Sequence, residues 1–235
     1  PSDINDMEKI CTEDYSVNLV DMADNTEDNK TVNDNPNDAK AISLGTQVYD
    51  TVATELEQRW YAFSVAKATK FTAAMVMDDT ADFDLYVYKL NETDGTLELV
   101  GGSAIVGAGT QELSMLKLDE GIYFIGIEAA TGNGSFLMYT YAGVNDGKEI
   151  NDTTDLASSY VRNSRMTATI DSPFDYDYYK VVISKNDILE YTFDQPTGCD
   201  YKVLVYDGKN YYTINNGTYR LNTGTYSVSY THLRA

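Results

Sequence analysis

Residues 82–88 alternate strictly between apolar and polar side chains, and this pattern predicts a β-strand that is buried on one face. Phe83, Leu85 and Val87 form the apolar face, while acids and tyrosines form the other. The same pattern returns over residues 200–206, at an offset of 118. The chain therefore contains an internal duplication, with one wet face expected on each copy of this strand.

The offset holds for a second strand and changes once along the chain. It also carries residues 60–65 onto 178–183, whereas 121–125 matches 224–228 at an offset of 103. The second copy is therefore 15 residues shorter, and the difference falls in the polar, glycine-rich stretch 91–109. Surface loops tolerate such length changes, so the two copies are expected to share one fold.

Short strand-like segments, separated by clusters of Gly, Asn, Asp and Thr, fill the first copy. They are expected near residues 40–44, 47–53, 59–66, 70–77, 83–90, 97–101, 112–118, 121–128 and 135–141. This spacing is typical of a β-sandwich or barrel, and no segment has a convincing helical period. We expect an all-β chain of two tandem antiparallel β-sandwiches with a jelly-roll or immunoglobulin-like arrangement.

The composition divides the chain into a leader and two sandwiches, with boundaries at 1–33, 34–143 and 144–235. Residues 1–34 contain ten acids and two lysines, which predicts a linker rather than a packed element. Within it, the alternation of residues 15–20 predicts one strand.

The second copy ends early relative to the first. It has no counterpart of the strand expected over 135–141, so we expect its sandwich to be incomplete. The tail 231–235 departs from the acidic, strand-like pattern, and it is either a natural short terminus or a foreign end.

The alternation also predicts the core of each copy. Trp60 falls on the face opposite to its neighbours Tyr61 and Phe63. The inward residues expected are Tyr61, Phe63, Val65, Phe83, Leu85, Val87, Tyr123, Ile125 and Ile127 in the first copy, and Tyr179, Val181, Ile183, Tyr201, Val203, Val205, Tyr226 and Val228 in the second.

Charge and residue inventory exclude several classes of function. A net charge of −20 repels phosphate backbones and anionic lipid surfaces, so we expect no nucleic-acid partner. No apolar run reaches the roughly 18 residues of a membrane helix, so no membrane insertion is expected. His232 is the only histidine and lies in the tail, which argues against an enzyme of the Ser-His-Asp or Cys-His type. Cys11 and Cys199 are either two thiols or one long-range disulfide.

Two groups of outward side chains have candidate chemistry. Asp82 and Asp84 share a strand face, and we favour a solvated face over a catalytic carboxylate pair because nothing indicates a cleft. Tyrosines expected to be exposed could form a binding face for protein or glycan, or could simply be good strand formers. They are Tyr86, Tyr88, Tyr206, Tyr211 and Tyr212.

Four short motifs, each present twice in the same order, carry a family resemblance. Asn35-Pro36-Asn37-Asp38 and Glu149-Ile150-Asn151-Asp152 open the copies, and Asp175-Tyr176-Asp177-Tyr178-Tyr179-Lys180-Val181 follows in the second. The repeated strand at 82–88 and a closing Gly-x-Tyr-x-apolar motif complete the set. Over about residues 34–230 the chain resembles the bacterial pre-peptidase C-terminal domain, a β-sandwich attached to secreted peptidases and surface proteins and related to the collagen-binding modules of clostridial collagenases.

The resemblance implies a secreted or cell-surface protein without catalysis of its own. The expected function is a binding or targeting module of an exported bacterial protein or secreted peptidase; the alternative is a structural spacer or processing segment with no ligand beyond calcium.

The resemblance also implies Ca²⁺ as a ligand, because carboxylates from an opening loop and a strand start can supply most of its six to eight oxygens. The second copy supplies the fuller set, and Arg59 stands in the first copy where an acid is expected. The implied ligands are Glu149, Asn151, Asp152, Asp175 and Asp177 in the second copy and, more weakly, Asn35, Asn37, Asp38 and Glu57 in the first.

Overall fold

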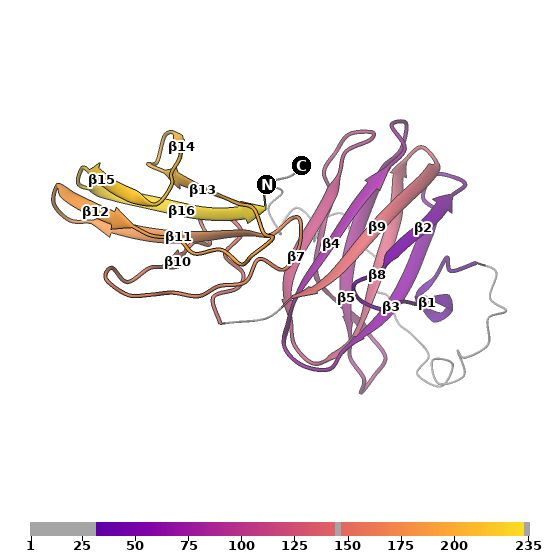
Figure 1. Ribbon diagram of the computed structural model, residues 1–235. Helices are drawn as coiled ribbons and strands as arrows, with labels where there is room; N and C mark the ends of the chain where they lie inside the picture. The colour runs from indigo at the N-terminus through magenta and orange to yellow at the C-terminus, as the bar shows by residue number, and fades with distance from the viewer. Residues whose placement is uncertain (1–31, 144–146, 233–235) are drawn as a thin grey trace. The chain divides into compact units, whose positions relative to one another are not determined.

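The computed structural model describes residues 32–143 and 147–232, and the chain divides into two compact units, Pro1–Gly143 and Val144–Ala235 (Figure 1). Within the described ranges the only helical element is a short 3-10 helix, η1 (Pro36–Asp38), and the remaining elements are strands. The all-β prediction is confirmed. The predicted leader strand at 15–20, most of the leader and the end of the tail lie outside the described residues.

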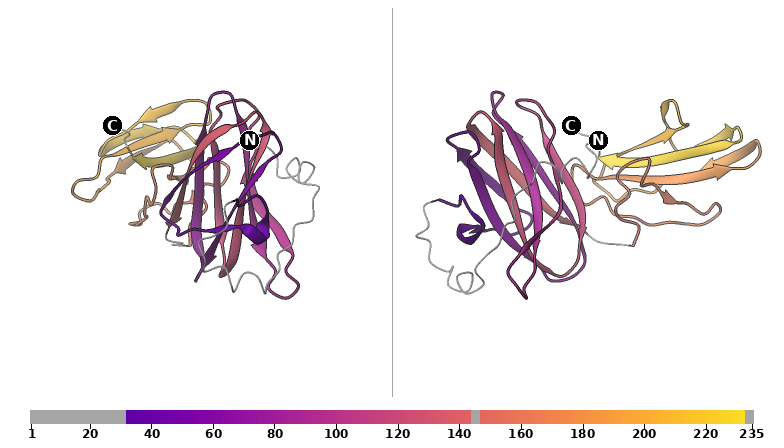
Figure 2. Two further views of the ribbon diagram at one scale, coloured as in Figure 1. Left: turned by 90° about the vertical axis from the view of Figure 1, so that its right-hand side faces the viewer. Right: turned by 180° about the vertical axis from the view of Figure 1, so that it is seen from behind.

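The first unit is a β-sandwich of two sheets that face each other (Figures 1 and 2). One sheet has the order β1-β3-β8-β5-β6, and the other has the order β2-β9-β4-β7. The strands are β1 (Lys40–Ala41), β2 (Gln47–Val52), β3 (Gln58–Val65), β4 (Thr69–Met77), β5 (Asp82–Leu90), β6 (Leu97–Ser103), β7 (Glu112–Leu118), β8 (Gly121–Thr131) and β9 (Gly134–Gly143).

The core between these sheets contains every inward residue predicted for the first unit. Phe63 stacks on Phe71 and on Tyr123, with ring centroids 5.0 and 5.6 Å apart. Phe136 of β9 meets the edges of Tyr61 and Phe83, so β9 joins the two sheets through its aromatic side chain. The alternation of apolar residues was therefore sufficient to identify this core.

The predicted wet face of β5 is wrong. Tyr86 and Tyr88 are only 2% and 3% exposed, and Asp82 and Asp84 on the same face are also buried. These tyrosines belong to a second apolar cluster on the outer side of the sheet, because aromatic side chains from neighbouring strands pack over one another there. Its members are Ala39, Trp60, Tyr86, Tyr88, Leu90 and Phe124, with Ala62, Leu97, Leu99, Ala104 and Ile122 packed against them.

The second unit repeats the first sheet and shortens the second. One sheet has the order β10-β11-β16-β13-β14, and the other has only β12 and β15. The strands are β10 (Ser158–Ser159), β11 (Tyr176–Ile183), β12 (Asp187–Tyr191), β13 (Tyr201–Tyr206), β14 (Tyr211–Thr213), β15 (Gly217–Leu221) and β16 (Gly224–His232).

The strand registers of the two units coincide at the offsets seen in the sequence. Tyr61 pairs with Ile125 in the first unit, and Tyr179 pairs with Val228 in the second. The shorter pair follows the same rule, since Thr69 pairs with Leu118 and Asp187 pairs with Leu221. β3, β4, β5, β7 and β8 therefore correspond to β11, β12, β13, β15 and β16.

Two strands of the first unit have no counterpart among residues 147–232. β9 lies between β2 and β4 in the first unit, whereas β12, the counterpart of β4, pairs with β15 alone. Residues 165–170 fall on β2 at the offset of 118, but they form no strand. The core is correspondingly weaker: Val181, Ile183 and Val203 are buried, while the predicted core residues Tyr201, Val205 and Tyr226 are only partly buried.

Candidate functional site

The second opening segment, residues 149–152, is hydrogen-bonded to the start of β11. Asn151 O accepts a hydrogen bond from Tyr178 N at 2.8 Å, and Asn151 Nδ2 donates to Tyr178 O at 3.3 Å. Tyr176 N donates to Asp152 Oδ1 at 3.3 Å. These contacts bring the predicted ligands of the opening segment beside Asp175 and Asp177, which flank Tyr176.

The acids of this region are buried rather than solvated. Glu149, Asn151, Asp175 and Asp177 are each at least nine-tenths buried. Asp175 Oδ2 accepts a hydrogen bond from Asp171 N at 2.7 Å, which adds Asp171 to the group; sequence reasoning did not include it. The buried oxygens are Glu149 Oε2, Asn151 Oδ1, Asp152 Oδ2, Asp177 Oδ1 and both carboxylate oxygens of Asp171.

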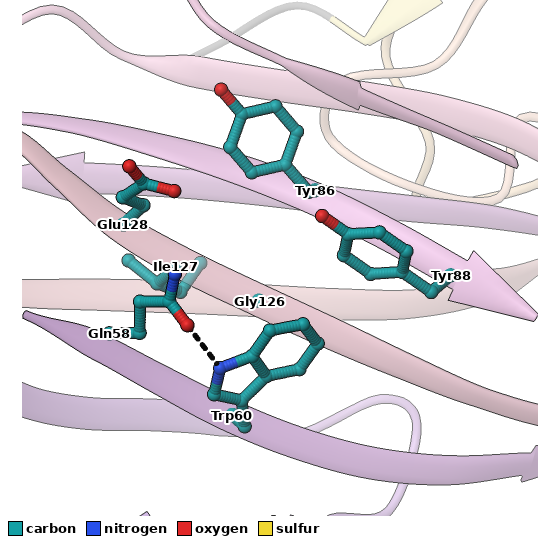
Figure 3. Close-up of a pocket in the computed structure, with 7 residues that line it drawn as sticks. All are labelled: Gln58, Trp60, Tyr86, Tyr88, Gly126, Ile127 and Glu128. Atoms are coloured by element: carbon teal, nitrogen blue, oxygen red, sulfur yellow. Dashed lines mark hydrogen bonds between the residues drawn. The ribbon is translucent and has the colours of Figure 1, made fainter. Parts of the chain in front are cut away.

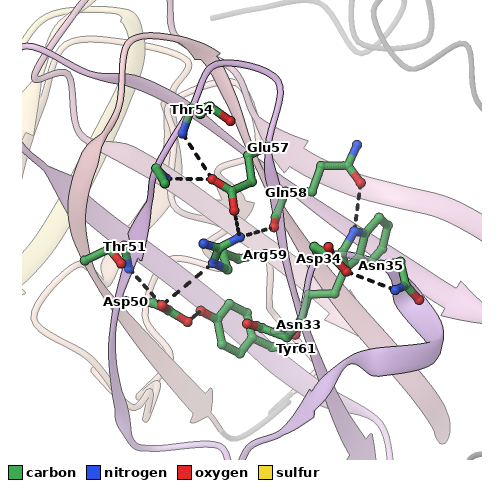
Figure 4. Close-up of polar contacts among 12 residues, drawn as sticks. Asn33, Asp34, Asn35, Asp50, Thr51, Thr54, Glu57, Gln58, Arg59 and Tyr61 are labelled. Carbon is green, nitrogen blue, oxygen red and sulfur yellow. Dashed lines mark hydrogen bonds and ion pairs between the residues drawn. The ribbon is translucent and has the colours of Figure 1, made fainter. Parts of the chain in front are cut away.

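The first unit builds the same frame with different residues (Figure 4). Asn33 O accepts from Trp60 N at 2.7 Å, and Asn33 Nδ2 donates to Trp60 O at 2.9 Å, which repeats the contacts of Asn151. Ala53 N donates to Glu57 Oε2 at 2.6 Å, as Asp171 N does to Asp175. The offset of 118 thus relates the two sites residue by residue.

This frame shows which first-unit residues are equivalent to the predicted ligands of the second unit. The counterparts of Asn151 and Asp152 are Asn33 and Asp34, not Asn37 and Asp38. Asn35 instead caps η1, because its Oδ1 accepts from the main-chain N–H groups of Asn37 and Asp38 and its Nδ2 donates to Asp38 Oδ2. The chain has two Asn-Asp pairs here, and Asn33-Asp34, four residues before Asn37-Asp38, is the pair equivalent to Asn151-Asp152.

Arg59 takes the position of Asp177 and supplies a positive charge inside the first site. Its guanidinium lies 2.8 Å from Glu57 Oε1 and 3.8 Å from Asp50 Oδ1. Burial alone would raise the pKa of Glu57, but the hydrogen bonds from Arg59, Ala53 and Thr54 outweigh it and lower that pKa. Tyr61 Oη donates to Asp50 Oδ2 at 2.7 Å and completes the network.

The two sites therefore differ in charge while sharing their backbone frame. At the offset of 118, Glu149, Asp171 and Asp177 replace Thr31, Ala53 and Arg59. Within the described residues no three carboxylate, imidazole or thiolate groups converge closely enough to hold a metal by themselves. A cation in the second site would therefore need the Asn151 amide oxygen, which accepts no hydrogen bond there, and main-chain carbonyls as additional ligands.

The predicted tyrosine face is closed in the first unit (Figure 3). Trp60 lies over Gly126, where an added Cβ would approach the indole ring to 3.2 Å, and its ring centroid is 5.3 Å from that of Tyr88. Trp60 Nε1 donates to Gln58 Oε1 at 2.8 Å, and Tyr86 Oη donates to Asp84 Oδ2 at 3.0 Å. Trp60, Tyr86 and Tyr88 line a small pocket together with Gln58 and Glu128, and these three aromatic side chains are at most 3% exposed.

The corresponding face of the second unit is more open. Tyr206 stacks on Tyr211 across β13 and β14, with ring centroids 4.6 Å apart, and Tyr211 is 52% exposed. Burial and the neighbouring Tyr211 raise the pKa of Tyr178, the counterpart of Trp60, to about 12. Tyr212 is also exposed, but its place next to Tyr211 in the strand puts it on the opposite face. Sequence reasoning missed Tyr178 as a member of this face.

Buried acids also lie in the first unit, away from the opening segment. Burial raises the pKa of Asp84 to about 6, and the nearby Asp82 and Glu128 act in the same direction against the Tyr86 hydrogen bond. Burial also raises the pKa of Glu112, whose carboxylate accepts from Ile105 N. Asp84, which was expected to be solvated, is therefore buried in a setting that raises its pKa.

The remaining residues with candidate chemistry are few. Cys199 is a free thiol, and Cys11 lies outside the described residues. The side chain of His232 also lies outside the described part of the chain. Over residues 32–143 and 147–232, no helix has the length and apolar character needed to cross a membrane.

Comparison with known proteins gives solved structures alone. No family model and no curated protein matches the chain. The pre-peptidase C-terminal domain of a collagenase from Bacillus anthracis is 14% identical with a TM-score of 0.38, covering 43% of this chain and 93% of its own. A protein from Sulfurospirillum deleyianum is 10% identical with a TM-score of 0.30, covering 42% of this chain and 98% of its own.

The CUB1-EGF-CUB2 domains of rat MASP-1 are 9% identical with a TM-score of 0.28, covering 84% of this chain and 95% of their own. All three TM-scores lie below 0.5 and all three identities below 25%, so we assign neither a family nor a function from them.

Proposed function

We propose that this chain is a noncatalytic binding module of an exported protein, and that it contacts its ligand through the tyrosine face of the second unit, Tyr178, Tyr206 and Tyr211. The observation that carries the proposal is the difference between the two outer faces. The first unit buries its aromatic side chains in a packed cluster, whereas the second has a stacked tyrosine pair in which Tyr206 is partly buried and Tyr211 is 52% exposed. Tyrosines are rigid and amphipathic, so they gain contact area at small entropic cost.

The chemistry of the face favours protein or glycan over charged polymers. The rings offer flat apolar surfaces with hydroxyl groups at their ends, and the chain's net charge of −20 disfavours anionic partners. The resemblance to modules of secreted peptidases is consistent with an extracellular polymer as the ligand.

A sedimentation assay tests this function. The chain is mixed with fibrillar collagen, purified peptidoglycan or an insoluble polysaccharide, and the bound fraction is measured after centrifugation. Tyr206→Ala with Tyr211→Ala is expected to lower the affinity for the bound polymer at least tenfold. Tyr49→Ala is the matched control, because Tyr49 is 70% exposed and belongs to the first unit, not to this face.

Loss of binding in both the double variant and the Tyr49 control would exclude the tyrosine face as the specific contact. Absence of binding to every polymer would favour the second candidate function, a structural spacer.

We further propose that Ca²⁺ binds at the second opening segment and fastens it to β11. The supporting observation is the internal comparison with the first unit, where Arg59 contributes a positive charge among acids and the second unit has Asp177 instead. Several like charges brought together by folding repel one another, and a bound cation relieves that repulsion. The residues that would hold it are Glu149, Asn151, Asp152, Asp171, Asp175 and Asp177.

A further inference from the structure

The loop between β6 and β7, residues 104–111, is held by two buried carboxylates. Gly107 N donates a hydrogen bond to Oδ2 of Asp82, the first residue of β5, at 3.0 Å. Ile105 N donates to both oxygens of Glu112, the first residue of β7, at 3.1 and 3.2 Å. We name these contacts the loop clasp. Because β5 and β7 belong to different sheets, the clasp ties the loop to both sheets of the first unit.

The two carboxylates of the clasp lie near a third buried acid, Asp84. Burial is the main cause of the raised pKa of Glu112, and the charges of Asp84 and Asp82 add to it. Burial likewise raises the pKa of Asp84, and the charges of Asp82 and Glu128 add to that shift. Asp82, Asp84 and Glu112 are each at least nine-tenths buried.

This corner of the first unit gathers more negative charge than its hydrogen bonds satisfy. Asp82 Oδ1 is a buried oxygen that accepts no hydrogen bond from the described residues. Like charges that are brought together away from water repel one another strongly, and protonation of one acid relieves that repulsion. The clasp is therefore expected to respond to a proton taken up beside it.

Asp84 is the acid that can take up this proton and leave the contacts of the clasp in place. Its Oδ2 accepts a hydrogen bond from Tyr86 Oη at 3.0 Å, whereas Asp82 and Glu112 hold main-chain N–H groups of the loop. Hydrogen bonds to an ionised carboxylate are stronger than those to a neutral one. A proton on Asp84 therefore removes a neighbouring charge without weakening the bonds that hold the loop.

We propose that loop 104–111 is ordered by a proton: the clasp is closed while Asp84 is neutral and opens when Asp84 is charged. A charged Asp84 repels Glu112, which comes from the opposite sheet. The loop gives way first, because β5 is hydrogen-bonded to β6 and β8, and β7 to β4. Gly107 has a φ of 140°, a conformation that glycine adopts readily, so the loop backbone is easily rearranged.

The clasp thereby sets the order of an exposed apolar tip. Ile105 and Val106 are 45% and 91% exposed, and they lie where the loop is hydrogen-bonded to Glu112 and, one residue later, to Asp82. The pKa of Asp84 is raised to about 6, so the tip is expected to be held in one arrangement below that pH and to move above it.

Amide hydrogen exchange, followed by NMR on the full chain, tests the proposal between about pH 5 and about pH 7.5. After correction for the intrinsic effect of pH on exchange, protection of the Ile105 and Gly107 N–H groups is expected to be at least about fivefold lower at the higher pH. Asp84→Asn should keep both groups protected throughout. The matched control, Asp79→Asn, changes an exposed acid beside the same loop and should behave as the natural sequence does.

A second variant is expected to move the transition rather than remove it. Tyr86→Phe deletes the hydroxyl that donates to Asp84 Oδ2 and lowers the pKa of Asp84 against the effect of burial. Without this bond the charged form is less favoured, so loop protection should be lost at a higher pH. A midpoint that stays in place or moves downward would assign the titration to another acid.

The amides of β8 separate loop opening from unfolding of the whole unit, and they should stay at least about tenfold better protected than the loop amides at either pH. Three further results would overturn the proposal: equal loop protection at both pH values, a pH effect that persists in Asp84→Asn, or loop amides as well protected as those of β8. None of these results depends on the tyrosine face or on Ca²⁺, so those proposals stand or fall separately.

Discussion

The two units share the same strand registers, but they differ in their second sheet and in the packing of their outer faces. The first unit has sheets of five and four strands, buries aromatic side chains on the inner and outer faces of β5, and has an arginine among its acids. The second unit keeps the central strands but has a two-stranded second sheet, a partly exposed tyrosine pair and no arginine at the equivalent position. Among the described residues, the difference lies in packing: the first unit buries the aromatic side chains on both faces of β5, whereas the second leaves Tyr211 about half exposed.

Substitution of equivalent core tyrosines is expected to show the largest effect of this difference in packing. Tyr123→Ala removes a side chain that is fully buried between two sheets, and it is expected to destabilise the first unit by about 3 to 5 kcal/mol. Tyr226→Ala, at the equivalent position in the second unit, removes a partly buried ring and is expected to cost less than half as much. Denaturant unfolding of each variant measures both values. Equal losses would mean that the second core is as tightly packed as the first.

The outer faces give a second contrast. Tyr86→Ala is expected to cost about 3 kcal/mol because Tyr86 is buried and hydrogen-bonded to Asp84, whereas Tyr211→Ala is expected to stay within about 0.5 kcal/mol. The same unfolding experiment compares the two variants. If Tyr86→Ala were as mild as Tyr211→Ala, the first unit would have an open face after all.

The inner core of the first unit could be predicted from the sequence, whereas the packing of its outer face could not. Period-2 alternation identified the strands and the inward core residues of the first unit, because burial between two sheets requires it. Alternation does not say whether the opposite face is covered, and so Tyr86, Tyr88, Asp82 and Asp84 were assigned to solvent. For the same reason, the contrast between Trp60 and Tyr178 became visible only in three dimensions.

The opening segments show a different limit of sequence reasoning. The acids Asp175 and Asp177 and the exception at Arg59 could be seen in the sequence, but the alignment of the opening motifs was wrong by several residues. A hydrogen-bond pattern, Asn33 with Trp60 and Asn151 with Tyr178, was needed to set the equivalence. Asp171 has no motif of its own, and only its contact with Asp175 reveals it.

The buried acid of the first unit predicts a smaller, pH-dependent effect. The pKa of Asp84 is raised to about 6, so the folded state holds a proton that the unfolded state releases near pH 4. Stability of the first unit is therefore expected to fall as pH rises from about 4 to about 6, and to level off above that.

Asp84→Asn is expected to remove this slope and to stabilise the unit at pH 7 by about 1 to 2 kcal/mol. Thermal unfolding across pH checks the prediction, with Glu92→Gln as a control at an exposed turn. A slope that survives Asp84→Asn would assign the titration to another group.

Calorimetric titration of Ca²⁺ into the full chain tests the central claim, that a cation in the second unit takes the place of the arginine in the first. We predict one binding event for the natural sequence and none for Asp177→Arg, whose guanidinium would supply the charge that Arg59 supplies beside Glu57. With a chelator present, the second unit of Asp177→Arg should melt at a higher temperature than that of the natural sequence. Asp155→Asn, at an exposed acid nearby, should bind Ca²⁺ as the natural sequence does. Binding that persists unchanged in Asp177→Arg, or no heat at millimolar Ca²⁺ in the natural sequence, would contradict the account.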